Sequence, residues 1–316
     1  MKVSAVGRIA VSITAAILAS AALGYPDKPV QYIIPFAAAG ESDIAARLQA
    51  QVFQAKFGKE MIVINKPGAG GALVWSQMNS MPGDGHTVVG VNLPHIVLQP
   101  LEPDAQFKTE DITPVYFFHY TPDAIIVPQD SPFKTFADLV KAAREKPDSV
   151  SLAGSGTNSA NHIASERLNR ELGIKTLYVP FKGTGDLVSS VLGNHVSGAM
   201  SYSTLAIQQK GKMRMLAVAT EQRLPQFPDV PTFKEIGLDW VDGAYRGIGV
   251  PKATPAAVRK QVSDMMDAIN KDPQHRKQMF EGGFEVTDIG LDQMDAFMRD
   301  RTAAYMKSAK LMGLTK

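Results

Sequence analysis

The sequence contains no cysteine among its 316 residues. Disulfide bonds, thiol catalysis and cysteine metal sites are therefore excluded, and the fold depends on the burial of its core. The sequence also has no Gly-Lys-Ser or Gly-Lys-Thr run, so it lacks the phosphate-binding loop of nucleotide hydrolases. Six histidines, at positions 86, 95, 119, 162, 195 and 275, show no metal-ligand spacing. We expect neither a metal nor a cofactor.

An excess of charge of one sign is also absent. The chain has 33 Lys and Arg residues against 31 Asp and Glu residues, and both surplus cations, Lys2 and Arg8, lie near the N-terminus. Without residues 1–24 the formal charge is zero, so no basic face for nucleic acid is expected. Hydrophobic residues at 45% and charged residues at 20% are typical of a globular protein. A chain of this length favours two domains.

The sequence lacks an apolar run long enough to cross a bilayer. Its longest candidate, Ile9–Leu23, is shorter than the ~20 residues that a membrane span needs. Two basic residues precede this run, and small residues precede Tyr25, as in a secretory signal peptide. We predict that residues 1–24 are a signal peptide cleaved near Gly24 and Tyr25; a buried helix or an uncleaved anchor is the alternative.

Complete motifs of serine hydrolases are missing as well. The run GSG at positions 154–156 departs from the Gly-x-Ser-x-Gly turn on which hydrolases present their nucleophile. His162 lies three residues after Ser159, so a hydrolase that uses Ser155 or Ser159 with His162 stays open as an alternative. The sequence places no acid beside this histidine to orient it.

The chain after residue 24 alternates short β-rich runs with longer helical patterns, which predicts an α/β fold with largely parallel sheets. Expected strands cover residues 30–35, 61–64, 87–91, 124–127, 150–153, 176–179, 213–219 and 244–250. Expected helices cover residues 42–57, 72–79, 135–145, 159–172, 186–192, 255–270 and 291–311. Proline-containing segments at 119–123 and 223–231 are predicted to cross between domains. These crossings give lobe 1 as residues 25–121 plus 225–316, and lobe 2 as residues 122–224.

Five strand-to-helix loops share a composition of glycine, small residues, hydroxyls and amides. They cover residues 35–43, 66–71, 92–95, 154–162 and 182–186. Such loops lie together at the carboxyl ends of the strands in an open α/β sheet. Helix starts carry unpaired N–H groups and a partial positive charge, so they can hold a carboxylate without lysine or arginine. The alternative is that Ser42, Asp43, Ser159 and Thr184 only cap their own helices, and Asp43 is expected to be structural.

An ordered series of segments carries a family resemblance. The segments are YPDKPVQYIIPF, INKPGAGG, MPGDGHTVVGVN, SGTNSANHIASERL, VPFKGTGDLVSSVLGNHV, LPQFPDVPTFKEIG and GVPKATP, between residues 25 and 255. They resemble the periplasmic receptors of tripartite tricarboxylate transporters, the Bug-type binding proteins. The resemblance implies a type II periplasmic binding protein fold, in which a two-segment hinge joins two α/β lobes around a ligand cleft. It also implies a periplasmic receptor that delivers a small organic carboxylate, expected to be a di- or tricarboxylate, to membrane permease subunits. Closure of two lobes around one anion favours a monomer.

Carried over by position, the resemblance implies a set of ligand-binding residues without a catalytic group. These are Phe36, Gly40, Ser42, Asn92, Ser155, Thr157, Asn158, Ser159, Asn161 and Thr184. Two positions depart from the family pattern, Glu41 in the first loop and Arg246 near the end of the chain. We expect both to reach the cleft, where they either pair with each other or divide the polar ends of a ligand. Two surface charges are the alternative at these positions, and a carboxylate sensor that acts on a signalling partner is the alternative to a transport receptor.

Overall fold

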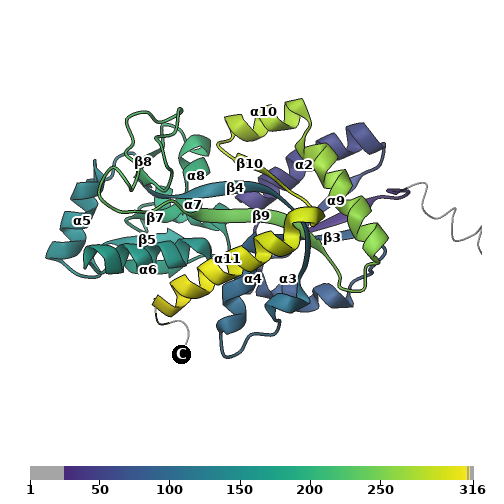
Figure 1. Cartoon of the computed structure of the whole chain (residues 1–316). Helices are drawn as coiled ribbons and strands as arrows, with labels where there is room; N and C mark the ends of the chain where they lie inside the picture. Colours follow the sequence, from purple (N-terminus) through teal and green to yellow (C-terminus); the bar gives the residue numbers. More distant parts are fainter. Residues whose placement is uncertain (1–24, 312, 314–316) are drawn as a thin grey trace, which may run out of the picture.

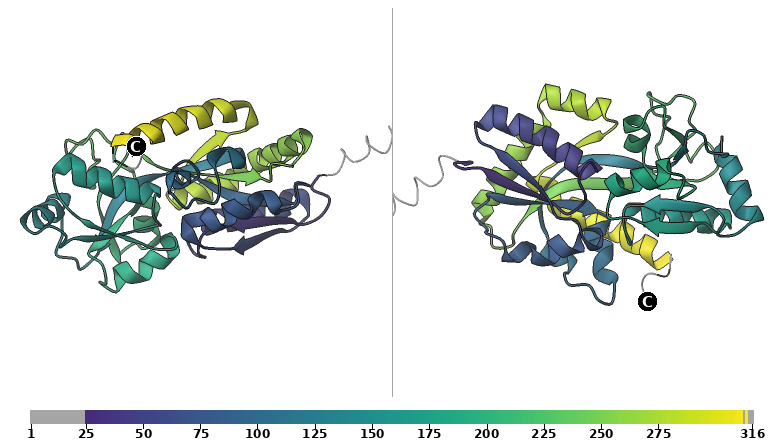
Figure 2. Two further views of the ribbon diagram at one scale, coloured as in Figure 1. Left: turned by 90° about the horizontal axis from the view of Figure 1, so that it is seen from below. Right: turned by 180° about the vertical axis from the view of Figure 1, so that it is seen from behind.

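The computed structural model describes residues 25–311 and 313, and the predicted signal peptide lies outside the described residues. Helices pack on both sides of a ten-stranded mixed sheet with the path β2-β1-β3-β9-β4-β7-β5-β6, and β8 and β10 pair with β4 off this path. Figure 1 shows the molecule as two halves along one long axis, and the further views in Figure 2 show the same two halves. None of the helices within residues 25–311 has the length and hydropathy to span a membrane.

The first half is built on three parallel strands, β1 (Val30–Ile34), β2 (Met61–Asn65) and β3 (Thr87–Leu93). Strand β9 (Gly243–Val250) pairs antiparallel with β3, and β10 (Glu285–Ile289) pairs antiparallel with β4. Buried side chains from these strands form one core together with the helices around them. The residue ranges predicted for β1, β2, β3 and β9 agree with the observed strands to within about two residues.

The second half has its own parallel strands, β5 (Ser151–Gly154), β6 (Leu177–Pro180) and β7 (Gly198–Tyr202). Strand β8 (Met213–Val218) pairs antiparallel with the end of β4. Two separate hydrophobic clusters cover the two faces of this smaller sheet. Strands β7 and β10 were not predicted.

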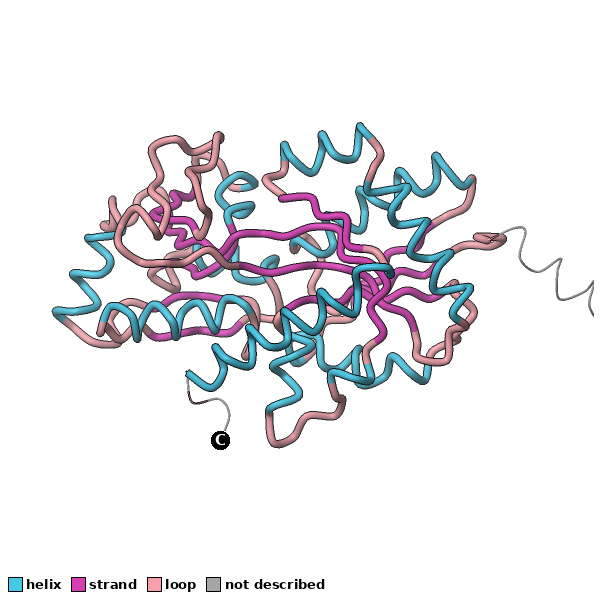
Figure 3. Tube along the Cα trace, in the orientation of Figure 1, coloured by secondary structure: helices cyan, strands magenta, loops and turns pink. Residues whose placement is uncertain are grey.

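One long strand, β4 (Thr113–Pro128), runs through both halves, as the tube in Figure 3 shows. Its first part pairs with β9, and from Asp123 onward it pairs with β7 and β8. The predicted crossing segment at 119–123 is therefore strand, and the change of partners within it supports a passage between the lobes at this place. Pro122 is tolerated since it stands where β4 changes partners.

We propose that the return crossing lies after the predicted segment 223–231. Residues 223–231 form turns within the second half, where Leu224 is buried and Phe227 packs against the same cluster. Phe233 and Trp240 belong to the other cluster of that half. The chain returns at Gly243, whose Cα approaches Thr121 so closely that a Cβ there would lie 2.0 Å from the Thr121 carbonyl oxygen. We therefore propose lobe 1 as residues 25–122 with 243–311, and lobe 2 as residues 123–242.

Ten α-helices occur among the described residues. They are α2 (Glu41–Phe57), α3 (Ala72–Gln77), α4 (His95–Leu98), α5 (Phe136–Glu145), α6 (Ala160–Leu172), α7 (Thr184–Leu192), α8 (Ser203–Gln208), α9 (Ala256–Asn270), α10 (Pro273–Glu281) and α11 (Leu291–Leu311). The seven predicted helices are all present, and α11 has the predicted bounds. Helices α4, α8 and α10 were missed. Helices α4 and α8 have only four and six residues, which are too few to show helical periodicity.

Candidate functional site

A small cavity lies where the two lobes meet, and we call it the inner chamber. Eight of the twelve residues expected to bind a ligand line it, together with two residues that were not expected. The lining consists of Phe36, Gly40, Glu41, Ser42, Asn92, Ser155, Thr184 and Arg246, with His95 and Tyr202 in addition. The loops that follow β1, β3, β5, β6 and β7 thus converge, as strand ends in an α/β sheet do.

The starts of helices α2 and α7 face one another across this cavity. Gly40 precedes α2 in lobe 1, and Gly183 precedes α7 in lobe 2. The two helix starts are nearly in contact, since a Cβ on Gly185 would lie 2.3 Å from the Ala38 carbonyl oxygen and 3.1 Å from the Gly40 nitrogen. Unpaired N–H groups and the positive ends of two helix dipoles therefore point at the same place.

Glu41 and Arg246 form an ion pair inside the chamber. Nη2 of Arg246 lies 2.5 Å from Oε2 of Glu41, and the two residues are only 3% and 2% exposed. The Thr121 hydroxyl donates to Oε2 of Glu41 over 3.2 Å and accepts from Nη1 of Arg246. The guanidinium also lies over the Tyr202 ring, 4.5 Å from its centroid. The alternative of two surface charges is therefore wrong.

Burial sets the protonation of the chamber's titratable groups. Desolvation raises the pKa of Glu41 to about 7, although Arg246 and the hydrogen bond from Thr121 act in the opposite direction. Desolvation and the nearby Arg246 lower the pKa of His95 to about 3, so its ring is neutral at physiological pH. Burial also raises the pKa of Tyr202, whose hydroxyl stays protonated. Above pH 7 the only charges in the lining are those of the Glu41–Arg246 pair.

The four other expected residues lie beside the inner chamber and do not line it. Asn161 accepts hydrogen bonds from the amide and the hydroxyl of Ser155, at 3.1 and 2.7 Å, and so fixes a residue that does line it. Ser159 caps α6 by accepting from the backbone N–H of His162. Asn158 donates from Nδ2 to Glu102 Oε1 over 2.8 Å, which joins lobe 2 to lobe 1. Thr157 lines a second, larger cavity.

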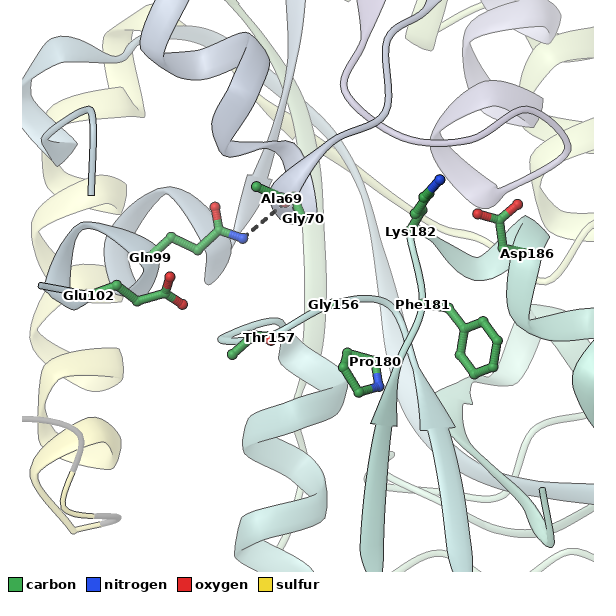
Figure 4. A pocket seen from close by; sticks show the side chains of 10 residues that line it. All are labelled: Ala69, Gly70, Gln99, Glu102, Gly156, Thr157, Pro180, Phe181, Lys182 and Asp186. Carbon is green, nitrogen blue, oxygen red and sulfur yellow. Dashed lines mark hydrogen bonds between the residues drawn. The ribbon is translucent and has the colours of Figure 1, made fainter. Parts of the chain in front are cut away.

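This second cavity, which we call the outer cavity, has a volume of about 540 Å³ and is drawn in Figure 4. Lobe 1 contributes Gln99 and Glu102 on one side, and lobe 2 contributes Lys182 on the other. The segments around Gly156 and Lys182 continue directly into the residues that line the inner chamber, so the two cavities share these loops. Gly70 and Gly156 touch across the lobes, because a Cβ on Gly156 would lie 3.3 Å from the Gly70 Cα.

Comparison with known proteins decides the family. A family model described as the tripartite tricarboxylate transporter family receptor matches residues 45–314. The chain belongs to this family. A relative from Agrobacterium vitis, the UPF0065 protein in the TAR-I ttuE-ttuC′ intergenic region, is 33% identical over 272 residues, which are 84% of this chain and 79% of the relative.

Solved structures of the same kind confirm the fold. The periplasmic binding protein BugD is 28% identical with a TM-score of 0.86 over 92% of this chain and 100% of BugD. Two Rhodopseudomonas palustris proteins, each 24% identical, have the same fold. One, Rpa4515 with adipate, has a TM-score of 0.85 over 92% of this chain and 98% of its own. The other, MatC with bound malate, has a TM-score of 0.81 over 90% and 99%. The predicted type II periplasmic binding fold is confirmed.

The hydrolase alternative has little support in this receptor family. Nδ1 of His162 accepts the backbone N–H of Asn158 over 3.1 Å. Ser159 uses its hydroxyl as a helix cap, and the Ser155 hydroxyl donates to Asn161. All three side chains of the hydrolase alternative are thus hydrogen-bonded to groups that hold the local structure. Within residues 25–311, His, Asp and Glu side chains form no group of three that could hold a metal ion.

Sequence reasoning missed two residues of this receptor's inner chamber. Tyr202 ends β7, a buried strand that was not predicted, so nothing indicated where its side chain would lie. His95 was noted within the loop 92–95 but was considered only as a metal ligand. Its place directly after the carboxyl end of β3, one of the parallel strands of lobe 1, was the signal that could have identified it.

Asn158→Asp is expected to weaken the contact between the lobes. The substitution keeps the size of the side chain and tolerates the positive φ of 49° at this position, but it replaces a donor by a carboxylate beside Glu102. Burial and Asp104 already raise the pKa of Glu102, so a further negative charge there is unfavourable. We expect roughly tenfold weaker ligand binding and a larger radius of gyration by X-ray scattering. The double variant with Glu102→Gln should recover most of the affinity. Equal affinity of the single variant and the wild type would show that the hydrogen bond between Asn158 and Glu102 does not support ligand binding.

Proposed function

We propose that this protein is a periplasmic receptor that captures a small organic carboxylate between its lobes and delivers it to the permease of a tripartite tricarboxylate transporter. The observation that carries the proposal is the meeting of the α2 and α7 helix starts in one buried cavity. Such N–H groups hold a carboxylate by charge-assisted hydrogen bonds. The lining holds the ligand mainly through these backbone N–H groups, with Arg246 as its one lysine or arginine. Hydrogen bonds of this kind support reversible binding and release of a ligand.

The family supports a proposal for the chemical class of the ligand and for the cellular location of the protein. Two proteins of this fold carry the dicarboxylates adipate and malate, which supports a di- or tricarboxylate ligand here. The outer cavity of about 540 Å³ is of the size that small-molecule sites have.

Residues 1–24 are proposed to direct export and to be removed before Tyr25. The mature receptor then acts as a monomer, because both halves of its site come from one chain.

Binding is proposed to proceed by closure of the lobes. The ligand first meets one lobe in an open form, and closure adds the helix start of the other lobe and excludes water. The chain passes between the lobes within β4 after Pro122 and again just before β9 at Gly243, and these two adjacent places are where we propose the hinge (Figure 1). The closed, liganded surface is what a permease would recognise.

A thermal-shift screen of residues 25–316 tests the proposal. Mono-, di- and tricarboxylates are compared with their methyl esters and with amines of the same length. A ligand that binds only the folded state raises the melting temperature with the logarithm of its excess, by about 2.7 kcal/mol of stability at 100 times the dissociation constant. We expect a shift with at least one carboxylate and none with its ester. Shifts with esters or amines alone would reject a carboxylate receptor.

A further inference from the structure

Five buried polar atoms in the lining of the inner chamber have no hydrogen-bond partner among the described residues. They are Oε1 of Glu41, Nε of Arg246, the hydroxyl of Tyr202 and both ring nitrogens of His95. Ser155 lies close to the rings of His95 and Tyr202, but its hydroxyl and its amide both donate to Asn161. Buried polar atoms are normally hydrogen-bonded, so these atoms together indicate a polar group that binds here.

Most of these atoms suit a carboxylate oxygen. Nε of Arg246 and the hydroxyl of Tyr202 can donate to it, and so can the one protonated nitrogen of the neutral His95 ring. The other nitrogen of His95 is an acceptor, which a carboxylate leaves unpaired. Oε1 of Glu41 is also an acceptor while Glu41 is ionised, and it becomes a donor when Glu41 is protonated. Protonation of Glu41 therefore makes the chamber a better site for an anion.

Glu41 lies where the helix starts hold a carboxylate. Gly40, Ser42 and Thr184 of these helix starts line the inner chamber beside Glu41, so a carboxylate bound by them places an oxygen in it. The free volume of the chamber is about 10 Å³, close to what one water-sized group needs, so this oxygen also contacts Oε1 of Glu41. Two ionised carboxylates that share a closed site repel each other, and the pKa of one is raised until it takes up a proton. The helix dipoles favour the charge of the ligand but place no proton between the two oxygen atoms.

Arg246 is the one cation in the lining that faces Glu41. The titratable groups around Glu41 are Arg246 on β9, Tyr202 on β7, Asp123 on β4, His95 on α4 and Asp43 on its own helix. Burial keeps Tyr202 protonated and, together with Arg246, keeps His95 neutral. Burial and Asp242 raise the pKa of Asp123 well above its ordinary value, and Asp43 pairs with Arg47. Burial also raises the pKa of Glu41 to about 7, so the proton is available to it near neutral pH.

We propose that Glu41 binds the ligand as a neutral acid, so that the receptor takes up one proton from the solvent with each carboxylate. Oε1 of the protonated Glu41 donates to the carboxylate, and Oε2 keeps its contacts with Arg246 and Thr121. The carboxylate then replaces Glu41 as the counter-charge of Arg246. This inference rests on the proposed function as a carboxylate receptor, and it assigns to Glu41 the coupling between ligand binding and pH.

Calorimetric titration of the wild-type protein counts the protons. Malate, succinate and adipate are the probes, because their carboxyl groups are fully ionised above pH 7 and carry no proton of their own. Titration at pH 8 in Tris and in HEPES, two buffers with different ionisation enthalpies, gives the number of protons taken up. We expect about one proton per bound probe, and an affinity that falls by roughly tenfold per pH unit above pH 7. If these three probes fail, a carboxylate that raises the melting temperature in the thermal-shift screen takes their place.

The possible results separate the role of Glu41 from the receptor function. Binding without proton uptake, at an affinity that stays within about threefold from pH 7 to pH 9, overturns the proposal and leaves the receptor function standing. Release of protons on binding also overturns it. Failure of the three probes and of every carboxylate in the thermal-shift screen rejects the receptor function itself. The wild-type protein decides the question, whether or not a variant folds.

Two variants then assign the proton to its residue. Glu41→Gln replaces the carboxyl group by a neutral amide of similar size, which can donate to a carboxylate at every pH. It should bind without proton uptake and with the same affinity at pH 7 and pH 9. Asp123→Asn is the matched control, since Asp123 is a buried carboxyl group near Glu41 whose pKa is also raised, and it should keep the uptake. Proton uptake that persists in Glu41→Gln would overturn the assignment.

Discussion

Replacing Arg246 by methionine is expected to lower the free energy of unfolding at pH 8 by about 3–5 kcal/mol. The substitution leaves the Glu41 carboxylate buried, with the Thr121 hydroxyl as its remaining hydrogen-bond donor. A loss of this size lowers the melting temperature of a chain this long by roughly 10 °C. Urea denaturation followed by tryptophan fluorescence measures it, because Trp75 and Trp240 are both buried.

The loss should depend on pH in a defined direction. Burial raises the pKa of Glu41 from 4.5 to about 7 in the folded protein. A raised folded pKa means that the stability contributed by protonation is complete below about 4.5 and is lost as the pH rises through about 7. Without Arg246 the folded pKa rises further, so Arg246→Met should be destabilised less at pH 5 than at pH 8.

The double variant Glu41→Gln with Arg246→Met is the control for this prediction. It removes both charges and leaves a neutral amide that Thr121 can still contact. A buried pair replaced as a whole often costs little stability, whereas a half-broken pair costs much. We expect the double variant to recover more than half of the loss. A single variant as stable as the wild type at both pH values would contradict a buried, paired Glu41.

The fold was predictable from sequence wherever the pattern was local. Alternating β-rich and helical runs located the parallel strands and the long helices, because each depends on residues near it in the chain. Strand β4 was misassigned at Pro122, since a proline normally interrupts a central strand. Its tolerance there depends on partners from β7 and β9, far away in sequence. Trp240 was assigned to lobe 1 for the same reason, because only tertiary packing places it in lobe 2.

The loops that form the candidate site could be predicted from the sequence, but the contacts of the individual residues could not. Loops at the carboxyl ends of parallel strands had to converge, so the loops 35–43, 154–162 and 182–186 were found from the sequence pattern. The family resemblance then indicated Phe36, Ser155 and Thr184 within them, and all three line the inner chamber. Asn158 was expected to touch a ligand but bonds Glu102 across the lobes. The pairing of Glu41 with Arg246 was one of three alternatives. The sequence could not choose among them, because Arg246 reaches Glu41 only through the pairing of β9 with β3 and β4.

Gly185→Ala is expected to reduce ligand affinity by about 100-fold or more with little loss of stability. A Cβ at this position would lie 2.3 Å from the Ala38 carbonyl oxygen of the other lobe, a distance that closed lobes cannot accommodate. Within lobe 2 the same change places alanine in a helix, which favours folding by up to ~1 kcal/mol. The variant should therefore stay folded and open. Calorimetric titration measures the affinity, and X-ray scattering measures the radius of gyration with and without ligand.

Gly183→Ala on the same loop separates closure from local damage. Gly183 has an extended backbone, and a Cβ there would meet its nearest atoms at 3.5 Å, an ordinary contact. This control should bind within about threefold of the wild type and contract on ligand addition. If Gly185→Ala also bound and contracted like the wild type, the contact between the α2 and α7 helix starts would not belong to the liganded state. Helix starts from both lobes would then not hold the carboxylate together, and binding would depend on one lobe alone.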